Sequence, residues 1–296
     1  MWRLTLVCGL LAHTVSTTFA QLKPFYTIQD DGTFDAIHFT LTATSGTCHI
    51  MPKMSDVPMN IYGDPDFEKI NPQFQSWTDN RMNFVDLLLE DYNSSGFSKS
   101  ISYNMFGPEK KGKNNWEIAL ADNKEYWLNL NYGIGQAVVD LSGISVKNLN
   151  IKTGSADVAV DYLSDLGNKI AMDTFYVKVD LGSLEARKMH LSRAKNIITD
   201  IGFGNVTLDF SDTPTTKSTI KSMVGAGSLE VFIPKNDTPV IIYMNNSPLC
   251  SVKLPKGYEE VDDNVYVSPS YSSMADNLLT FEIDVALGNA SFRYSK

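Results

Sequence analysis

Apolar and polar residues alternate along several short stretches of the chain, which is the pattern of half-buried β-strands. Phe39 to Thr44, Ser145 to Lys152 and Thr174 to Asp180 all alternate with a period of two. The pattern returns at Pro239 to Tyr243 and at Leu278 to Val285. The chain is therefore predicted to be all-β, with alternate side chains of each strand inside the fold and in solvent.

A hairpin is predicted around the turn-like residues 93–96, between Phe84 to Asp91 and Ser98 to Phe106. A short helix over Arg81 to Glu90 is the alternative. The β-rich neighbours and the turn chemistry favour a strand. The segment from Met51 to Trp77 is rich in Pro, Asp and Asn, and is predicted to be a long surface connection.

A glycine-containing phrase followed by alternating apolar residues recurs along the second half of the chain. Copies begin at residues 133, 154, 182, 202 and 225, at intervals of 21, 28, 20 and 23. A period near 20 residues suits one coil of a β-solenoid, in which each coil stacks on the one before it. Glycine is expected at the corners, where the backbone takes a positive φ or packs closely under the next coil. The predicted corner glycines are Gly133, Gly135, Gly154, Gly182, Gly202, Gly204, Gly225, Gly227 and Gly288.

Three parts are predicted from these patterns. Residues 1–20 are predicted to be a signal peptide, residues 21–126 a β-rich N-terminal domain, and residues 127–296 a β-solenoid domain. Leu287 to Tyr294 reads as one more glycine phrase. This terminal coil is predicted to cover the open apolar end of the solenoid.

The first residues have the features of an export signal. Arg3 precedes an apolar run from Leu4 to Ala12, and the small residues Thr18 and Ala20 stand at the −3 and −1 positions of a cut. This arrangement predicts cleavage after Ala20. No other stretch approaches the roughly 20 apolar residues of a membrane helix. We therefore expect a secreted, periplasmic or cell-surface protein whose mature chain has no membrane-spanning segment.

Cys48 and Cys250 remain once Cys8 leaves with the signal. In an oxidising compartment an even pair favours a disulfide, which would tie the start of the mature chain to its end. The alternative is two separate buried thiols that pack as small hydrophobic groups.

Charge and motifs exclude several classes of function. The net charge of −9 argues against a nucleic-acid partner, because no basic field displaces phosphate counterions. His38, His49 and His190 lack metal-ligand spacing, so no metal site is predicted. No G-x-S-x-G elbow and no complete phosphate-binding loop occurs. The sequence therefore predicts no catalytic residues and no cofactor.

Acidic residues end several of the glycine phrases. Asp140, Asp161 and Asp209 occupy this position, and stacked coils could bring them into one line. Aligned carboxylates bind Ca²⁺ or sugar. The alternative is that each carboxylate accepts hydrogen bonds from backbone amides in the turn after its strand.

Two further groups of residues have side chains suited to carbohydrate chemistry. Glu185, Arg187 and Lys188 form a conceivable catalytic cluster, but charges on an outward strand face are usually only solvated. Aromatic residues either form a sugar-stacking platform or anchor the core, and core anchoring is the favoured reading. These residues are Trp77, Trp116, Tyr126 and Trp127.

The run from Trp127 to Val158 contains Gly133-Ile134-Gly135, then Asp140-Leu141-Ser142-Gly143, a Val146-Lys147-Asn148-Leu149 strand and Gly154-Ser155-Ala156-Asp157-Val158. This pattern resembles that of the toast-rack and putative-adhesin families of bacterial envelope proteins. The likeness continues through Gly202 to Asp209 and Gly225 to Pro234. The resemblance implies a β-helix of the cell envelope, in a group with proposed adhesin-like or envelope-stress roles, and it transfers no catalytic residues.

Three functions follow as hypotheses. The first is a non-enzymatic β-solenoid that acts as a scaffold, an adhesin-like surface or a ligand-binding module, with an envelope or surface component as partner, either protein or glycan. The second is a carbohydrate-active β-helix enzyme, which an acidic groove lined with aromatic residues would distinguish. The third is an envelope-stress sensing component that needs a membrane partner.

Overall fold

The computed structural model describes residues 25–92, 114–210, 212–235 and 238–295. The predicted signal peptide and the predicted hairpin turn at residues 93–96, with the strand after it, lie outside these residues. The described part is nearly all β, with one 3₁₀ turn, η1 (Met189–Leu191). Within this described part, no helix is long and apolar enough to cross a membrane.

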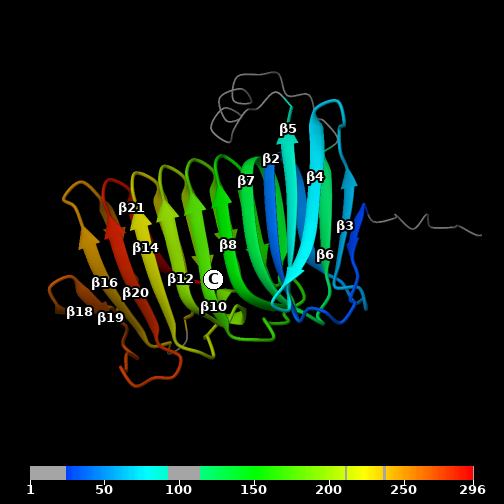
Figure 1. Ribbon diagram of the computed structural model, residues 1–296. Helices are drawn as coiled ribbons and strands as arrows, with labels where there is room; N and C mark the ends of the chain where they lie inside the picture. Colours follow the sequence, from blue (N-terminus) through cyan, green and yellow to red (C-terminus); the bar gives the residue numbers. More distant parts are fainter. Residues whose placement is uncertain (1–24, 93–113, 211, 236–237, 296) are drawn as a thin grey trace, which may run out of the picture.

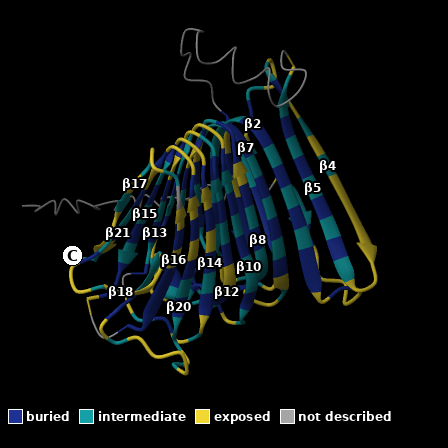
Figure 2. Cartoon of the chain, turned by 90° about the vertical axis from the view of Figure 1, so that its left-hand side faces the viewer, coloured by how far each residue is buried: buried dark blue, intermediate teal, exposed yellow. Residues whose placement is uncertain are grey.

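Two β-sheets face each other across the core and are joined at the corners of successive coils (Figures 1 and 2). We call them the front sheet and the back sheet. Strands β2 (Ala36–Pro52) and β7 (Glu125–Asp140) are long enough to run through both sheets. Within each sheet the strands are parallel, except at the ends. This arrangement confirms the predicted β-solenoid.

The front sheet carries the candidate site and is the row seen first in Figure 1. It continues the first halves of β2 and β7 on both sides. Its order is β4 (Ile70–Asp79), β5 (Met82–Asp91), β2, β7, β8 (Ser145–Thr153), β10 (Met172–Val179), β12 (Ala194–Ile201), β14 (Ser218–Val224), β20 (Leu279–Val285), β16 (Val240–Asn246), β19 (Val265–Val267) and β18 (Glu259–Asp262).

The back sheet contains the second strand of each coil. It also begins and ends with short strands. Its order is β1 (Tyr26–Ile28), β3 (Met59–Asp64), β6 (Asn115–Leu120), the second halves of β2 and β7, β9 (Asp157–Asp161), β11 (Ser183–Ala186), β13 (Asn205–Asp209), β15 (Ser228–Ile233), β21 (Asn289–Tyr294) and β17 (Ser251–Lys253).

Alternation along each strand divides its side chains between core and surface. In β10, Phe175 and Val177 are fully buried, while Tyr176 and Lys178, which alternate with them, face outward. Burying a side chain of this size contributes about 1.5–3 kcal/mol. Because parallel neighbours are in register, inward residues stack into continuous apolar rows and outward residues form surface rows.

Glycines stack at the corner between the two sheets. A Cβ added to Gly182, Gly204, Gly227 or Gly288 would lie 2.1–2.3 Å from a carbonyl oxygen of the neighbouring coil. This distance is far inside van der Waals contact, so close approach excludes a side chain here. Gly135 lies at the bend within β7, where its φ is +121° and an added Cβ would also lie 2.0 Å from the carbonyl oxygen of Gly46.

The last coil in sequence is not the last coil in space. β20 lies between β14 and β16, and β21 lies between β15 and β17. The prediction that Leu287 to Tyr294 covers the solenoid end is therefore wrong. After β15 the chain first forms the outer coil, β16 and β17, and the β18–β19 hairpin. It then returns as β20 and β21, which lie between the β14–β15 coil and the outer coil. Leu279 and Phe281 are consequently fully buried.

At the N-terminal end, too, the order of strands in space differs from their order in sequence, because β2 lies between β5 and β7. β4 and β5 form an antiparallel hairpin through Asn80 and Arg81, which both have positive φ. The predicted connection over Met51 to Trp77 is thus wrong, because it contains β3 and most of β4. Pro72 and the polar residues suggested a loop, but an edge strand accepts both.

The strand predicted over Phe84 to Asp91 is confirmed as β5, and the helix alternative is wrong. The predicted domain boundary after residue 126 falls inside β7, and the β2–β7 pairing continues on both sides of it, from Ala36 with Glu125 to Ile50 with Val139. The division into two domains stays a prediction.

The disulfide alternative for Cys48 and Cys250 is corrected by the structure, in which both are free thiols. Cys48 lies in β2, whereas Cys250 directly precedes β17. Seven strand spacings of about 4.8 Å, about 34 Å in all, separate β2 from β17. A disulfide needs Cα atoms within about 7 Å. Cys48 is instead packed in the core, where burial raises its pKa to about 12.

Candidate functional site

The outer face of the front sheet carries large aromatic, amide and charged side chains in rows that cross the strands. Four features lie along it, from the β4 end to the β18 end. We call them the aromatic row, the amide cluster, the lysine hollow and the carboxylate groove.

The aromatic row consists of one ring from each of four neighbouring strands. Trp77 of β4 stacks on Phe84 of β5, with ring centroids 5.3 Å apart and planes 11° from parallel. Phe84 meets His38 of β2 edge to face at 5.4 Å, and His38 is in register with Trp127 of β7. Trp77 is 47% exposed. The row therefore presents ring surface to solvent across three strand spacings, about 14 Å.

The amide cluster adjoins the aromatic row on β7 and β8. Asn129 and Asn150 are in register, and Asn148 lies beside Trp127. The amide nitrogen of Asn129 lies 2.7 Å from Nε2 of His38. Burial lowers the pKa of His38, partly opposed by the nearby Asp86 carboxylate, and so favours the neutral ring that accepts this hydrogen bond.

The four aromatic residues singled out from the sequence divide between the two alternatives. Trp116 is buried and donates its indole N–H to the Asn114 side chain at 2.7 Å. Tyr126 is also buried, and its hydroxyl lies 2.7 Å and 2.8 Å from two backbone carbonyl oxygens. Core anchoring is therefore confirmed for these two, whereas Trp77 and Trp127 lie on the outer face.

The lysine hollow is a depression of about 470 Å³ over β2, β7, β8 and β10. Lys152 of β8 and Lys178 of β10 stand in register, so two like charges are neighbours across the strands. Tyr176 precedes Lys178 by two residues and faces the same side. The residues that line the hollow are Thr42, Asn131, Lys152, Thr153, Tyr176, Lys178 and Asp180.

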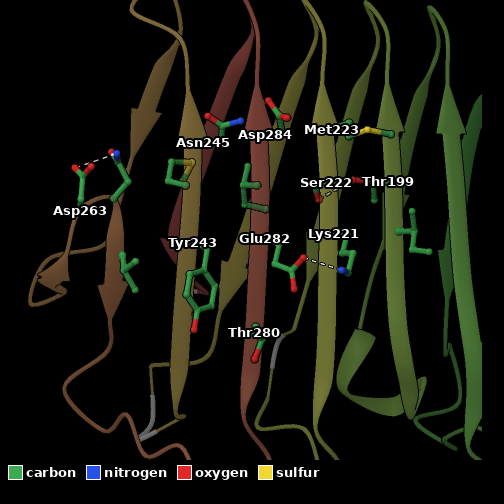
Figure 3. A pocket seen from close by; sticks show the side chains of 15 residues that line it. Thr199, Lys221, Ser222, Met223, Tyr243, Asn245, Asp263, Thr280, Glu282 and Asp284 are labelled. Carbon is green, nitrogen blue, oxygen red and sulfur yellow. Dashed lines mark hydrogen bonds and ion pairs between the residues drawn. The ribbon is translucent and has the colours of Figure 1, made fainter.

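The carboxylate groove is larger, at about 830 Å³, and lies over β12, β14, β20, β16 and β19 (Figure 3). Glu282 and Asp284 point outward from β20, and Tyr243 of β16 is in register with Glu282. Asp263, in the turn between β18 and β19, lies at the edge of the groove. Carboxylates and an aromatic ring therefore converge here.

Lys221 lies opposite Glu282 on β14, and its ammonium group is 2.8 Å from the Glu282 carboxylate. The ion pair occupies the middle of the groove (Figure 3). Behind it, the buried hydroxyls of Thr199 and Ser222 are hydrogen-bonded at 2.7 Å. The two charges at the groove centre thus neutralise each other.

The aspartates that end the glycine phrases lie on the back sheet. Asp140 is in register with Asp161, but Arg187 occupies the next position of the row and its guanidinium lies 3.7 Å from Asp161. Asp140 accepts the backbone N–H of Ser142 at 3.0 Å, and Asp161 accepts that of Tyr162 at 2.7 Å. The alternative of turn hydrogen bonds is confirmed for these two residues.

The cluster of Glu185, Arg187 and Lys188 is brought together as ion pairs. Arg187 binds Glu185 through two nitrogen atoms at 2.6 and 2.8 Å, while Lys188 pairs with Asp165 at 2.5 Å. Its charges are therefore matched within the protein. The three histidines are not brought together, since His38 is on the front sheet, His49 on the back sheet and His190 in η1. The described residues contain no group of three or more potential metal ligands.

Comparison with known proteins identifies part of the chain. Residues 93–182 match the family model for the N-terminal domain of toast_rack, DUF2154. The resemblance to the toast-rack family is confirmed for the run from Trp127 to Val158, which lies within this match. The matched toast-rack region contains Trp127 of the aromatic row, the amide cluster and both lysines of the hollow.

No curated protein matches the sequence. Among solved structures, that of a putative cell adhesion protein from Clostridium sporogenes ATCC 15579 is similar, with 12% sequence identity. The match covers 91% of this chain and 97% of that chain, at a TM-score of 0.43.

Proposed function

We propose that this protein is a non-enzymatic binding module that holds a glycan on the outer face of its front sheet. The main observation that supports this proposal is the aromatic row. Trp77 is 47% exposed, and Phe84, His38 and Trp127 beside it are partly exposed on the same face. The apolar C–H faces of sugar rings pack on such aromatic surfaces, and amides such as Asn148 beside them bind hydroxyl groups.

The length of the surface supports an extended ligand. The aromatic row spans about 14 Å across the strands, and the amide cluster and lysine hollow continue the polar surface over β8 and β10. Ligand sites generally combine apolar surface with a few placed polar groups. An oligosaccharide meets both requirements.

The absence of catalysis is part of the proposal and is supported by the groove. Glu282, at the centre of the groove, is held by Lys221 at 2.8 Å, so a cation of the protein compensates its carboxylate. A surface that holds a glycan without cleaving it suits an adhesin-like or scaffolding role.

A glycan panel tests the proposal. Wild type is expected to bind at least one oligosaccharide, and Trp127→Ala to bind it about tenfold less tightly, as for the loss of one aromatic contact. Gln136→Ala is the matched control, because Gln136 is an exposed residue of the same strand on the back sheet. Equal binding by wild type and Trp127→Ala, or binding of no glycan, would contradict the proposal.

The enzyme alternative has one observation in its favour, the acidic groove beside Tyr243. The same glycans are incubated with wild type and with Glu282→Gln, and the products are analysed by mass spectrometry. We expect no product from either protein. Cleavage by wild type that Glu282→Gln abolishes would establish a carbohydrate-active enzyme instead.

A further inference from the structure

We propose that the lysine hollow binds the carboxylate of an acidic sugar, so that the glycan held by the front face is an anionic one. This inference rests on the proposed function and names the ligand class. Two lysines in register on neighbouring strands are the starting point. Like charges directly opposite each other in a sheet are destabilising, so the pair of Lys152 and Lys178 does not serve the fold.

The two lysines differ in their surroundings. Lys178 lies 3.7 Å from Asp200 and 4.0 Å from Asp180, so acidic groups of the protein compensate its charge. Lys152 is exposed, and no carboxylate of the described residues lies within 4.0 Å of its ammonium group. Both carboxylates lie beside Lys178, so Lys152 is the cation of the hollow that remains open to a ligand, although the whole protein has a net charge of −9.

One free positive charge matches a ligand group with one negative charge. A phosphate monoester carries nearly two and would meet Asp180 at the side of the hollow. A carboxylate carries one and forms a short, charge-assisted hydrogen bond with an ammonium group. The single unpaired ammonium group therefore favours a carboxylate over a phosphate monoester beside Lys152.

The rest of the hollow suits the remainder of a sugar. Tyr176 supplies a ring, and Thr42 and Asn131 supply a hydroxyl and an amide within the same depression. Its volume of about 470 Å³ lies within the usual range of small-molecule sites. Asn131 follows Trp127 by four residues on β7, about 13 Å along the strand, so one extended glycan reaches both the aromatic row and the hollow.

The test uses an oligogalacturonate and its carboxyl-reduced, neutral counterpart as matched ligands in titration calorimetry. Wild type is expected to bind the acidic oligomer about tenfold more tightly, with a preference that weakens as salt is raised. Lys152→Gln is expected to lose this preference and to bind the neutral oligomer as wild type does. Lys253→Gln is the control, since Lys253 is an exposed lysine of β17 on the back sheet.

Folding of the variant is checked independently. Because Lys152→Gln removes a like-charge neighbour of Lys178, its melting temperature should equal or exceed that of wild type. A lower melting temperature would show that Lys152 serves the fold, and would overturn the argument.

The outcomes separate this inference from the proposed function. Equal binding of both oligomers, weakened by Trp127→Ala but not by Lys152→Gln, would overturn the inference and leave the proposed function intact. Binding of neither oligomer, in a protein that also binds nothing on the panel, would overturn both. A glycerol-phosphate oligomer is included, and Lys152-dependent binding of it in preference to the galacturonate would overturn the assignment to a carboxylate.

Discussion

Each coil has two outer faces, and they differ in how far their polar side chains are paired. On the back sheet polar side chains bond to one another: the Ser183 hydroxyl donates to Asp157 and the Ser228 hydroxyl to Asn205, both at 2.6 Å, and Arg187 pairs with Glu185. On the front sheet the aromatic row is partly exposed, and Lys152 has no charged partner among the described residues. The comparison supports the proposal that the front face, rather than the back face, is the binding surface.

The largest effect on stability is expected at the glycine corner that joins the front and back sheets. A Cβ at Gly227 would lie 2.1 Å from the carbonyl oxygen of Gly204, and backbone cannot move aside as a flexible side chain would. We expect Gly227→Ala to lower the free energy of unfolding by about 3 kcal/mol, at the upper end of overpacking costs. Denaturant unfolding measures the change.

The adjacent Ala226 is exposed and provides a control for Gly227→Ala. Ala226→Ser should leave stability within about 0.5 kcal/mol of wild type. If Gly227→Ala were equally harmless, the corner would not be held by close packing.

A smaller effect separates the two faces directly. Arg187 of the back sheet binds Glu185 and lies 3.7 Å from Asp161, whose side chain is only 8% exposed. Arg187→Met leaves that carboxylate without its cation, and we expect a loss of about 1 kcal/mol in unfolding free energy. Lys152→Met on the front sheet should cost nothing. Comparable losses in both variants would remove the distinction between the faces.

The strands of the solenoid could be predicted from the sequence, but their order in space could not. β20 alternates like every other coil strand, with Leu279 and Phe281 inward, so its pattern places it in a sheet. The pattern does not say which strands are its neighbours. Its position between β14 and β16 depends on the connection after β15, which carries no periodic signal.

The aromatic row could not be predicted from the sequence for the same reason. Trp77, Phe84, His38 and Trp127 lie on strands that follow the order β4, β5, β2 and β7 in space, which is not their order in sequence. Because successive residues of a strand face opposite sides, Trp127 is on the other face from the buried Tyr126. This alternation could have predicted that Trp127 lies on the surface. Only the register of the paired strands shows that the four rings lie in one row.

The pairing of Lys152 with Lys178 could not be predicted from the spacing of the glycine phrases. Lys152 stands two residues before Gly154, whereas Lys178 stands four residues before Gly182. Aligning the glycine phrases therefore shifts the two lysines by two positions, although they are in register in the sheet. The hollow follows from strand pairing and not from the spacing of the repeats.

A still smaller effect tests the hydrogen bonds of the back face. Ser228 donates its hydroxyl to Asn205 at an exposed position, so Ser228→Ala should cost about 0.5 kcal/mol in unfolding free energy. Glycan binding should not change, because the front face is untouched. Weakened binding in Ser228→Ala would show that the ligand contacts the back sheet.

The last prediction concerns a pH dependence confined to the front face. Burial lowers the pKa of His38 from its ordinary value of 6.5, so the folded state prefers the neutral ring more strongly than the unfolded state does. The unfolded chain therefore binds more protons as the pH falls through about 6.5, and His38 then contributes a loss of stability. This loss stops growing once the pH is below the pKa of the folded state.

His38→Gln removes that contribution and keeps a polar side chain beside Asn129. Unfolding free energies of both proteins between pH 8 and pH 4 should run in parallel above about 6.5 and converge or cross below it. The difference between the two curves isolates His38, because burial also lowers the pKa of His190 in both proteins. Curves that stay parallel throughout would mean that His38 is no more buried than a free histidine, and that the aromatic row does not pack as a continuous surface.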